Sequence, residues 1–219
     1  MHRKKLLAIG GALAVAAVMP AANALAATKV TVRIEGKNKT LLPATAVTPH
    51  RGTVKMSGRG CPSATGAGAV ALAVHGAWSG TWFSFGFEAT KILGETDKYS
   101  TTNSYWELFV NNVASQSGIC DVKLKRGEQI LFAAVPATGT EFPLELIAPR
   151  HATAGTAVRV TVKAFDAKGK AKPLARATVA GTTTDSNGTA TVTLTHAGKV
   201  TLTAADKGYI RAEAQVRVS

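Results

Sequence analysis

Ser104-Tyr-Trp-Glu-Leu-Phe-Val110 is the most strand-prone stretch of the chain, and the prediction of the fold starts from it. Aromatic residues, Leu and Val fill the stretch, and such residues favour β-strands. Asn111-Asn112 follows it and favours a turn. A second turn at Lys125-Arg-Gly-Glu128 leads to an apolar run from Gln129 to Val135. This part of the chain is therefore predicted to be built on strands.

The residues before this stretch add further strands and one helix. Alternating apolar residues predict a half-buried strand over Thr28–Glu35 and an extended piece over Leu41–Val47. Pro49–Pro62 is rich in Gly, Pro and basic residues, which predicts a loop. Ala64–His75 is apolar and follows Ser63, a suitable N-cap, so we expect a short helix there. Two extended pieces, Trp82–Phe87 and Glu88–Leu93, complete a predicted α+β domain.

A change of pattern marks a second domain. Pro136–Pro143 carries Pro, Thr and Gly and is the predicted boundary. Beyond it, short alternating segments are separated by turns such as Asp166–Gly169 and Asp185–Gly188, which indicates a β-sandwich over residues 142–219. The predicted fold class is therefore mostly β, with an α+β domain at 28–136 followed by a sandwich.

Several residues of the first domain carry a resemblance to a known family. It resembles the extracellular family related to the carboxyl-terminal domain of transcobalamin and intrinsic factor, through Tyr105, Trp106, Asn111, Gly118, Gly127, Glu128 and Ile130. That resemblance implies a β-grasp-like fold for residues 28–136. The second domain is similar to bacterial immunoglobulin-like domains through Thr184–Ala190, Gly208-Tyr209, Val216 and Val218. This similarity implies an immunoglobulin-like β-sandwich serving as spacer or adhesion unit.

The amino terminus predicts export. Met1–Lys5 is cationic, Leu6–Met19 is apolar, and Ala24-Leu25-Ala26 forms an A-x-A site, the three parts of a secretory signal peptide. We expect residues 1–26 to be removed after Ala26, with Ala24 as the second choice. An uncleaved membrane anchor is the alternative, although the apolar run is shorter than the ~20 residues that span a bilayer. The predicted location is extracellular or cell-wall associated, with no stable membrane insertion after cleavage.

The charge balance indicates anionic partners. The chain has 26 Lys and Arg against 13 Asp and Glu. Without Arg3, Lys4 and Lys5 of the signal peptide, 23 basic residues face the same 13 acidic ones, a formal charge of +10. Such a charge favours an anionic cell-wall or surface polymer. The basic residues form no stripe within a known motif, so no specific nucleic acid partner is expected.

Cys61 and Cys120 are the two cysteines of the chain. Two thiols of an exported protein usually pair, which predicts a disulfide between them. Two free thiols are the alternative.

No motif indicates catalysis, a cofactor or a metal. The histidines show neither an i, i+4 pair nor HExxH spacing. Ser79-Gly80 lacks the context of a G-x-S-x-G elbow. The sequence therefore predicts no enzyme, no cofactor, no catalytic residue and no metal ligand.

Aromatic residues are the candidates for ligand binding. Trp78, Trp82, Tyr105 and Trp106 all lie in the first domain, where exposed rings would provide stiff contact surface. Filling a small core is the alternative for each of them, and for Trp106 it is the favoured position. Tyr105 and Trp106 are neighbours on one strand and must face opposite sides of the sheet. Trp78 and Trp82 flank Gly80 in a predicted loop, which favours exposure.

Two functional hypotheses follow. The first is a secreted, non-catalytic binding protein, whose first domain recognises a surface polymer or another surface protein while the second acts as spacer. The second is an extracellular capture protein for a small molecule such as a corrinoid, through the aromatic residues around Trp78 and Trp82.

Overall fold

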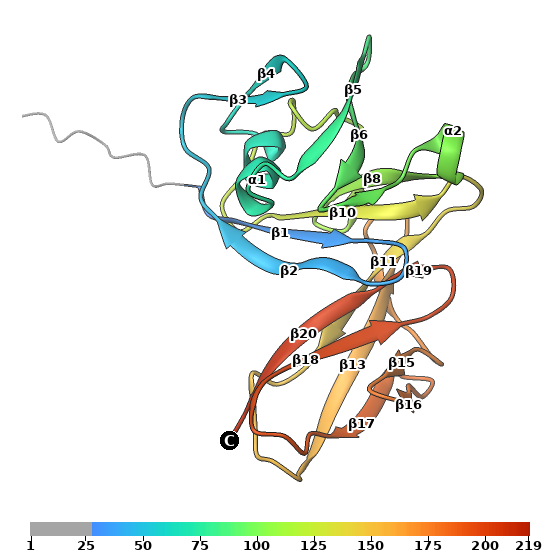
Figure 1. Cartoon of the computed structure of the whole chain (residues 1–219). Coiled ribbons are helices and arrows are strands. Elements are labelled where there is room, and N and C mark those ends of the chain that lie inside the picture. Colours follow the sequence, from blue (N-terminus) through green and yellow to red (C-terminus); the bar gives the residue numbers. More distant parts are fainter. Residues whose placement is uncertain (1–27) are drawn as a thin grey trace, which may run out of the picture.

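The computed structural model describes residues 28–219, which form two stacked bodies (Figure 1). The predicted signal peptide, residues 1–26, lies outside the described residues. Strands make up most of the regular structure, which confirms the mostly-β prediction. Below, residues 28–136 are called the first domain and residues 142–219 the second domain. Among the described residues, one main cluster of buried side chains lies within each of these two ranges.

A five-stranded mixed sheet is the centre of the first domain. Its order is β2 (Thr40–Val47), β1 (Val30–Glu35), β10 (Gln129–Pro136), β8 (Ser104–Val110) and β9 (Val113–Ala114). β1 and β10 run parallel, whereas the other neighbours are antiparallel. The strands predicted from alternation and β-propensity are therefore present, and β8 has the predicted bounds.

β10 is buried on both faces. Ile130, Phe132 and Ala134 belong to the core of the first domain, whereas the alternate residues Leu131, Ala133 and Val135 belong to a second cluster on the opposite face. Successive side chains of a strand point to opposite faces, so both faces of this strand need a cover.

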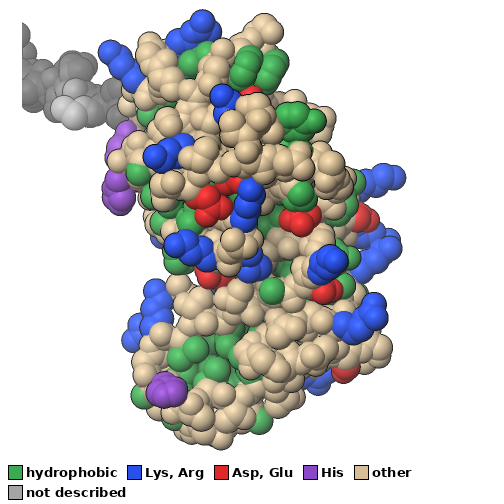
Figure 2. Space-filling model, turned by 45° about the vertical axis from the view of Figure 1, so that its right-hand side comes forward, with side chains coloured by type: hydrophobic (Ala, Val, Ile, Leu, Met, Phe, Trp, Pro, Cys, Tyr) green, Lys and Arg blue, Asp and Glu red, His purple; other side chains and the backbone are tan. Residues whose placement is uncertain are grey.

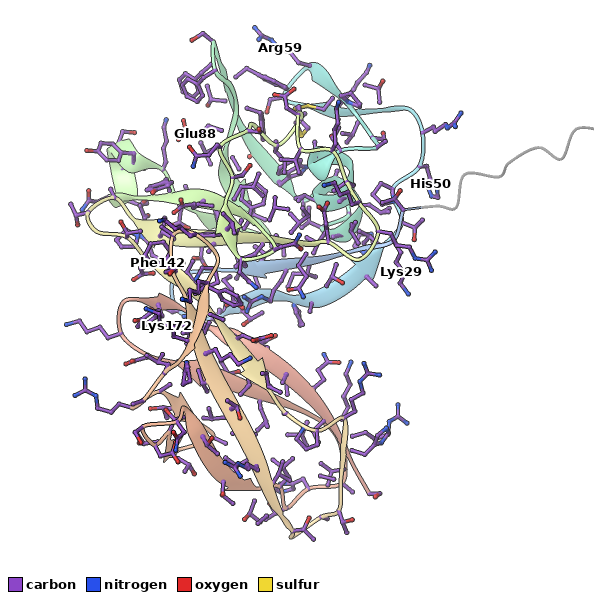
Figure 3. All side chains as sticks on the ribbon, turned by 180° about the vertical axis from the view of Figure 1, so that it is seen from behind. Lys29, His50, Arg59, Glu88, Phe142 and Lys172 are labelled. Atoms are coloured by element: carbon purple, nitrogen blue, oxygen red, sulfur yellow. A yellow bond between two sulfur atoms is a disulfide. The ribbon has the colours of Figure 1, made fainter. Side chains whose placement is uncertain are left out.

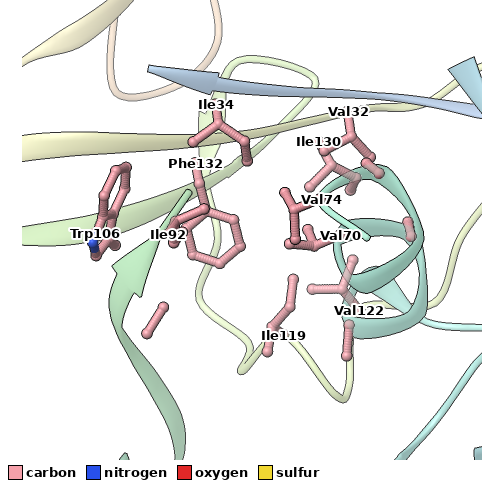
Figure 4. Close-up of a cluster of buried hydrophobic side chains, with 14 of the residues drawn as sticks. Val32, Ile34, Val70, Val74, Ile92, Trp106, Ile119, Val122, Ile130 and Phe132 are labelled. Carbon is pink, nitrogen blue, oxygen red and sulfur yellow. The ribbon is translucent and has the colours of Figure 1, made fainter. Parts of the chain in front are cut away.

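Helix α1 (Gly66–Ala73) covers the first face. Figure 4 shows Val70 of this helix and Val74 just beyond it beside the apolar side chains of the sheet. The helix begins later than predicted, because Thr65 is held extended by a bridge to Lys123 and is the N-cap in place of Ser63. Gly68 is required here, since a Cβ would lie 1.9 Å from the Ser63 carbonyl oxygen.

Two small sheets complete the first domain, and both correct the sequence analysis. The predicted loop Pro49–Pro62 contains a hairpin of β3 (Thr53–Met56) and β4 (Arg59–Pro62). Its turn residues Ser57 and Gly58 both have positive φ, 44° and 85°, which suits the twist of a two-residue hairpin turn.

The second small sheet contains β5 (Trp78–Phe83), β6 (Gly86–Ile92) and β7 (Glu95–Thr96). The predicted loop around Gly80 is thus part of a strand, because β5 pairs with β6 along its whole length. A four-residue helix, α2 (Tyr99–Thr102), was not predicted; it ends at Asn103, which is left-handed.

The second domain consists of two five-stranded sheets with a core between them, dominated by Val, Leu and Ala. One sheet contains β14 (Ala171–Pro173), β13 (Ala157–Phe165), β11 (Phe142–Ile147), β19 (Tyr209–Ile210) and β17 (Thr189–Thr193). The other contains β12 (His151–Ala152), β20 (Ala212–Val218), β18 (Gly198–Ala205), β15 (Thr178–Val179) and β16 (Thr182–Thr183).

The second domain covers the other face of β10. Ile210 of β19 is 4% exposed and lies in one cluster with Leu131, Ala133, Val135 and Phe109 of the first domain. The junction is therefore an apolar contact between the two domains.

Charged groups surround this contact. Glu35 is 1% exposed and pairs with Arg33 at 2.9 Å and with Arg211 of the second domain at 3.3 Å. Arg211 also donates to the carbonyl oxygens of Lys37 and Gly36. Burial raises the pKa of the Glu35 carboxyl, while the Arg33 and Arg211 guanidinium groups oppose that shift. The carboxylate thus depends on donors from both domains.

Replacing Arg211 by Ala is expected to lower the free energy of unfolding by about 2–3 kcal/mol, because it leaves the buried Glu35 with fewer donors. Urea denaturation of the full chain measures the change. Lys207→Ala, in the adjacent exposed turn, is the control and should alter stability by less than about 0.5 kcal/mol. Equal stabilities of the two variants would contradict this account of the junction.

Candidate interaction surface

The described residues contain no group of three or more His, Cys, Asp or Glu side chains arranged to hold a metal ion. Within residues 28–219, no helix has the length and apolar character needed to cross a bilayer. The aromatic side chains of the first domain are the remaining candidates for a binding site.

The four predicted binding residues do not form one surface. Trp78 and Trp82 lie on the same face of β5, half-buried, and both rings contact Phe87 at centroid distances of 5.3 Å. Trp106 is 6% exposed in the core of the first domain. Tyr105 points to the opposite face of the sheet, where it packs against the cluster that includes Ile210.

Two phenylalanines at the end of the β5–β6 hairpin are the exposed aromatic residues of this region. Phe83 is 44% exposed and Phe85 is 74% exposed. Their rings are stacked with centroids 5.1 Å apart and planes 5° from parallel. Alternation along β5 explains the arrangement, because Trp82 turns toward the core and its neighbour Phe83 must turn away.

The sequence analysis did not select this pair. The signal was present in the run Trp82-Phe-Ser-Phe-Gly-Phe87, where a Gly after alternating aromatic residues indicates a hairpin turn. Gly86 has a φ of 130° and directly follows Phe85, which allows the chain to turn there.

The β3–β4 hairpin supports the aromatic hairpin from one side. The Trp82 indole Nε1 donates to the Met56 carbonyl oxygen at 2.8 Å, and the Ser57 hydroxyl donates to the Gly80 carbonyl oxygen at 2.8 Å. The Arg59 guanidinium lies 5.6 Å from the centroid of the Trp82 ring, within range of a cation–π contact. These contacts fix the two hairpins side by side.

The disulfide holds a third segment at the same end. Cys61 of β4 is bonded to Cys120, as predicted, with 5.3 Å between the Cα atoms. Cys120 belongs to a loop that includes Gly118, whose Cβ position would lie 3.8 Å from the Phe85 carbonyl oxygen. The loop beside the Phe pair is therefore covalently tied to the β3–β4 hairpin.

We name Arg59, Trp82, Phe83 and Phe85 the aromatic platform. Figure 3 places Arg59 at the end of the first domain that is remote from Phe142 at the domain junction. Hydrophobic and cationic side chains lie close together on the uppermost part of the molecule in Figure 2. Lys55 of the β3–β4 hairpin is exposed as well, which adds a second cation to this end of the domain. This end of the first domain therefore offers a flat apolar contact at Phe83 and Phe85 and positive charge on the neighbouring β3–β4 hairpin.

A comparison with known families matches part of the first domain, outside the aromatic platform. Residues 89–135 match a family described as Domain of unknown function (DUF4430), from within β6 to near the end of β10. No curated protein matches the sequence. A proposed metal-binding protein from Ruminococcus gnavus is similar in structure, with 13% identity and a TM-score of 0.36, over 50% of this chain and 97% of that one.

Removing the disulfide is expected to loosen the platform and the domain. The bond joins residues 59 positions apart, so its loss in Cys61→Ala/Cys120→Ala should cost about 4 kcal/mol on the chain-entropy account. Urea denaturation of the oxidised wild type and the double variant measures the difference. A reductant should destabilise the wild type and leave the variant unchanged, and a loss under about 1 kcal/mol would refute the expectation.

Proposed function

We propose that the protein is an exported, non-catalytic binding protein whose aromatic platform recognises an anionic cell-wall or surface polysaccharide. The exposed, stacked pair of Phe83 and Phe85 carries the proposal, and Arg59, over the Trp82 ring of the same hairpin, adds a cation at this end of the domain. The cationic and apolar leader at residues 1–26 and the Cys61–Cys120 disulfide support export. The second domain serves as a spacer, so that the platform lies at one end of the molecule and the far end of the second domain lies at the other.

Two properties of the platform favour a sugar polymer. Stacked rings offer a flat, stiff surface, which suits the apolar face of a sugar ring. Arg59 and Lys55 of the neighbouring β3–β4 hairpin would complement carboxylate or phosphate groups elsewhere along the polymer. Because the hairpins are already fixed by hydrogen bonds and the disulfide, little conformational freedom is lost on binding.

The finer assignments remain proposals. The transcobalamin-like resemblance of the first domain and the immunoglobulin-like resemblance of the second rest on short motifs. The corrinoid-capture hypothesis also stays a prediction, and it would need Trp78 and Trp82 to bind a ligand through their exposed edges. Since both rings are half-buried against Phe87, the polysaccharide hypothesis requires less rearrangement.

The test is co-sedimentation of the mature protein with isolated bacterial cell walls. The wild type should be retained at low salt and released as salt rises, because added ions screen exposed charges. Phe83→Ala/Phe85→Ala should weaken binding by at least about tenfold, since it removes both flat contact surfaces.

Tyr99→Ala is the matched control. Tyr99 is a 66% exposed aromatic residue in α2, outside the platform. Its loss should leave retention unchanged, and circular dichroism should show all variants folded. Failure of the wild type to sediment at low salt, or equal retention of the double variant, would refute the proposal.

A further inference from the structure

A groove of about 600 Å³ lies on the second domain, remote from the aromatic platform. It follows the place where the chain passes from one sheet to the other, between Ile147 of β11 and His151 of β12. The first residues of β13 form its opposite wall. The groove thus lies at a seam between the two sheets of the sandwich.

One strand edge along this groove is open. β11 pairs with β13 only over residues 161–164 of β13, because the chain then leaves to pair with β20 as β12. β17 pairs with residues 157–161 on the other side of β13. Among the described residues, Ala157–Val160 therefore has no strand partner on the groove side.

The hydrogen bonds of Val162 show which groups face the groove. Its N–H donates to Gly188 and its carbonyl accepts from Leu174, so both groups point to the side of β17 and β14. Main-chain groups of successive strand residues point to opposite sides. By this alternation the N–H and carbonyl groups of Ala157 and Arg159 point into the groove, where they can pair with an added strand.

The groove combines an apolar floor with a basic rim. Ile147, a large apolar residue that is 43% exposed, lies next to Ala148, Pro149 and Ala152. An adjoining hollow shares His151 and is lined by Arg150, Lys199 and Arg217, while Arg159 lines the groove itself. No Asp or Glu side chain of the described residues lines either of these two surfaces.

We infer that this groove binds an extended, acidic peptide segment of a partner protein, which adds a strand to the open edge of β13. Main-chain hydrogen bonds to Ala157 and Arg159 would supply affinity, as in other cases of strand addition. Alternate apolar side chains of the peptide would rest on the floor, and its acidic side chains would meet the basic rim.

A peptide suits the groove better than a polysaccharide does. The open edge offers donors and acceptors at the spacing of a β-strand. The floor is aliphatic and, apart from the His151 ring, contains no aromatic ring for a sugar to stack on. The groove shares no residue with the aromatic platform. A test of peptide binding is therefore independent of a test of the proposed function.

The experiment uses a fluorescein-labelled octapeptide of alternating glutamate and valine and the mature protein. Fluorescence anisotropy should show saturable binding that weakens with salt. Arg159→Glu/Arg217→Glu should weaken binding by at least tenfold. The control Lys168→Glu/Lys170→Glu makes the same charge change at exposed positions beyond the other end of β13, and it should leave binding within about twofold.

Two further probes separate strand addition from simple charge attraction. The same peptide N-methylated on every second amide keeps its charge but loses donors, and it should bind at least tenfold more weakly. Hydrogen exchange at the amides of Ala157 and Arg159 should slow when the unmodified peptide binds. Equal binding of the methylated peptide, unchanged exchange at both amides, or slowed exchange with polygalacturonate in place of the peptide would overturn the inference.

Discussion

The structure depends on the burial of β10 from both sides. Leu131, Ala133 and Val135 would face water if the second domain were absent, whereas Ile130, Phe132 and Ala134 pack under α1. Apolar side chains gain free energy when they leave water, roughly 25 cal/mol per Å² of buried apolar surface. The second domain, through Ile210 and the neighbouring Arg211, is therefore part of the folding unit of the first.

Fixed docking places the two candidate binding surfaces toward opposite ends of one elongated body. The β5–β6 hairpin extends from the end of the first domain, whereas β12, at the groove, pairs with the C-terminal end of β20, which lies away from the junction (Figure 1). Both surfaces combine apolar side chains with positive charge, in accord with the excess of Lys and Arg over Asp and Glu in the chain. A body of this kind can bridge a surface polymer and a protein.

Sequence patterns predicted those features that local periodicity determines. The alternation of apolar residues predicted β1, and the residue composition predicted β8. The presence of two cysteines predicted the disulfide. The β3–β4 hairpin was missed because its Gly and basic residues are those of a loop, and only pairing across Ser57-Gly58 makes them strands. The exposure of Phe83 and the partial burial of Tyr105 depend on packing between distant segments. The open edge of β13 depends on where β11 leaves its sheet, a tertiary feature that no local pattern of residues reports.

Nitrogen-15 relaxation of backbone amides in the full mature chain tests most directly whether the two domains form one body. Amides of β8 and β10 and amides of β13 and β18 should report one common rotational correlation time, since the apolar contact around Ile210 and the ion pairs of Glu35 hold the junction. Distinct correlation times for the two sets, with the second domain tumbling faster on its own, would contradict the account.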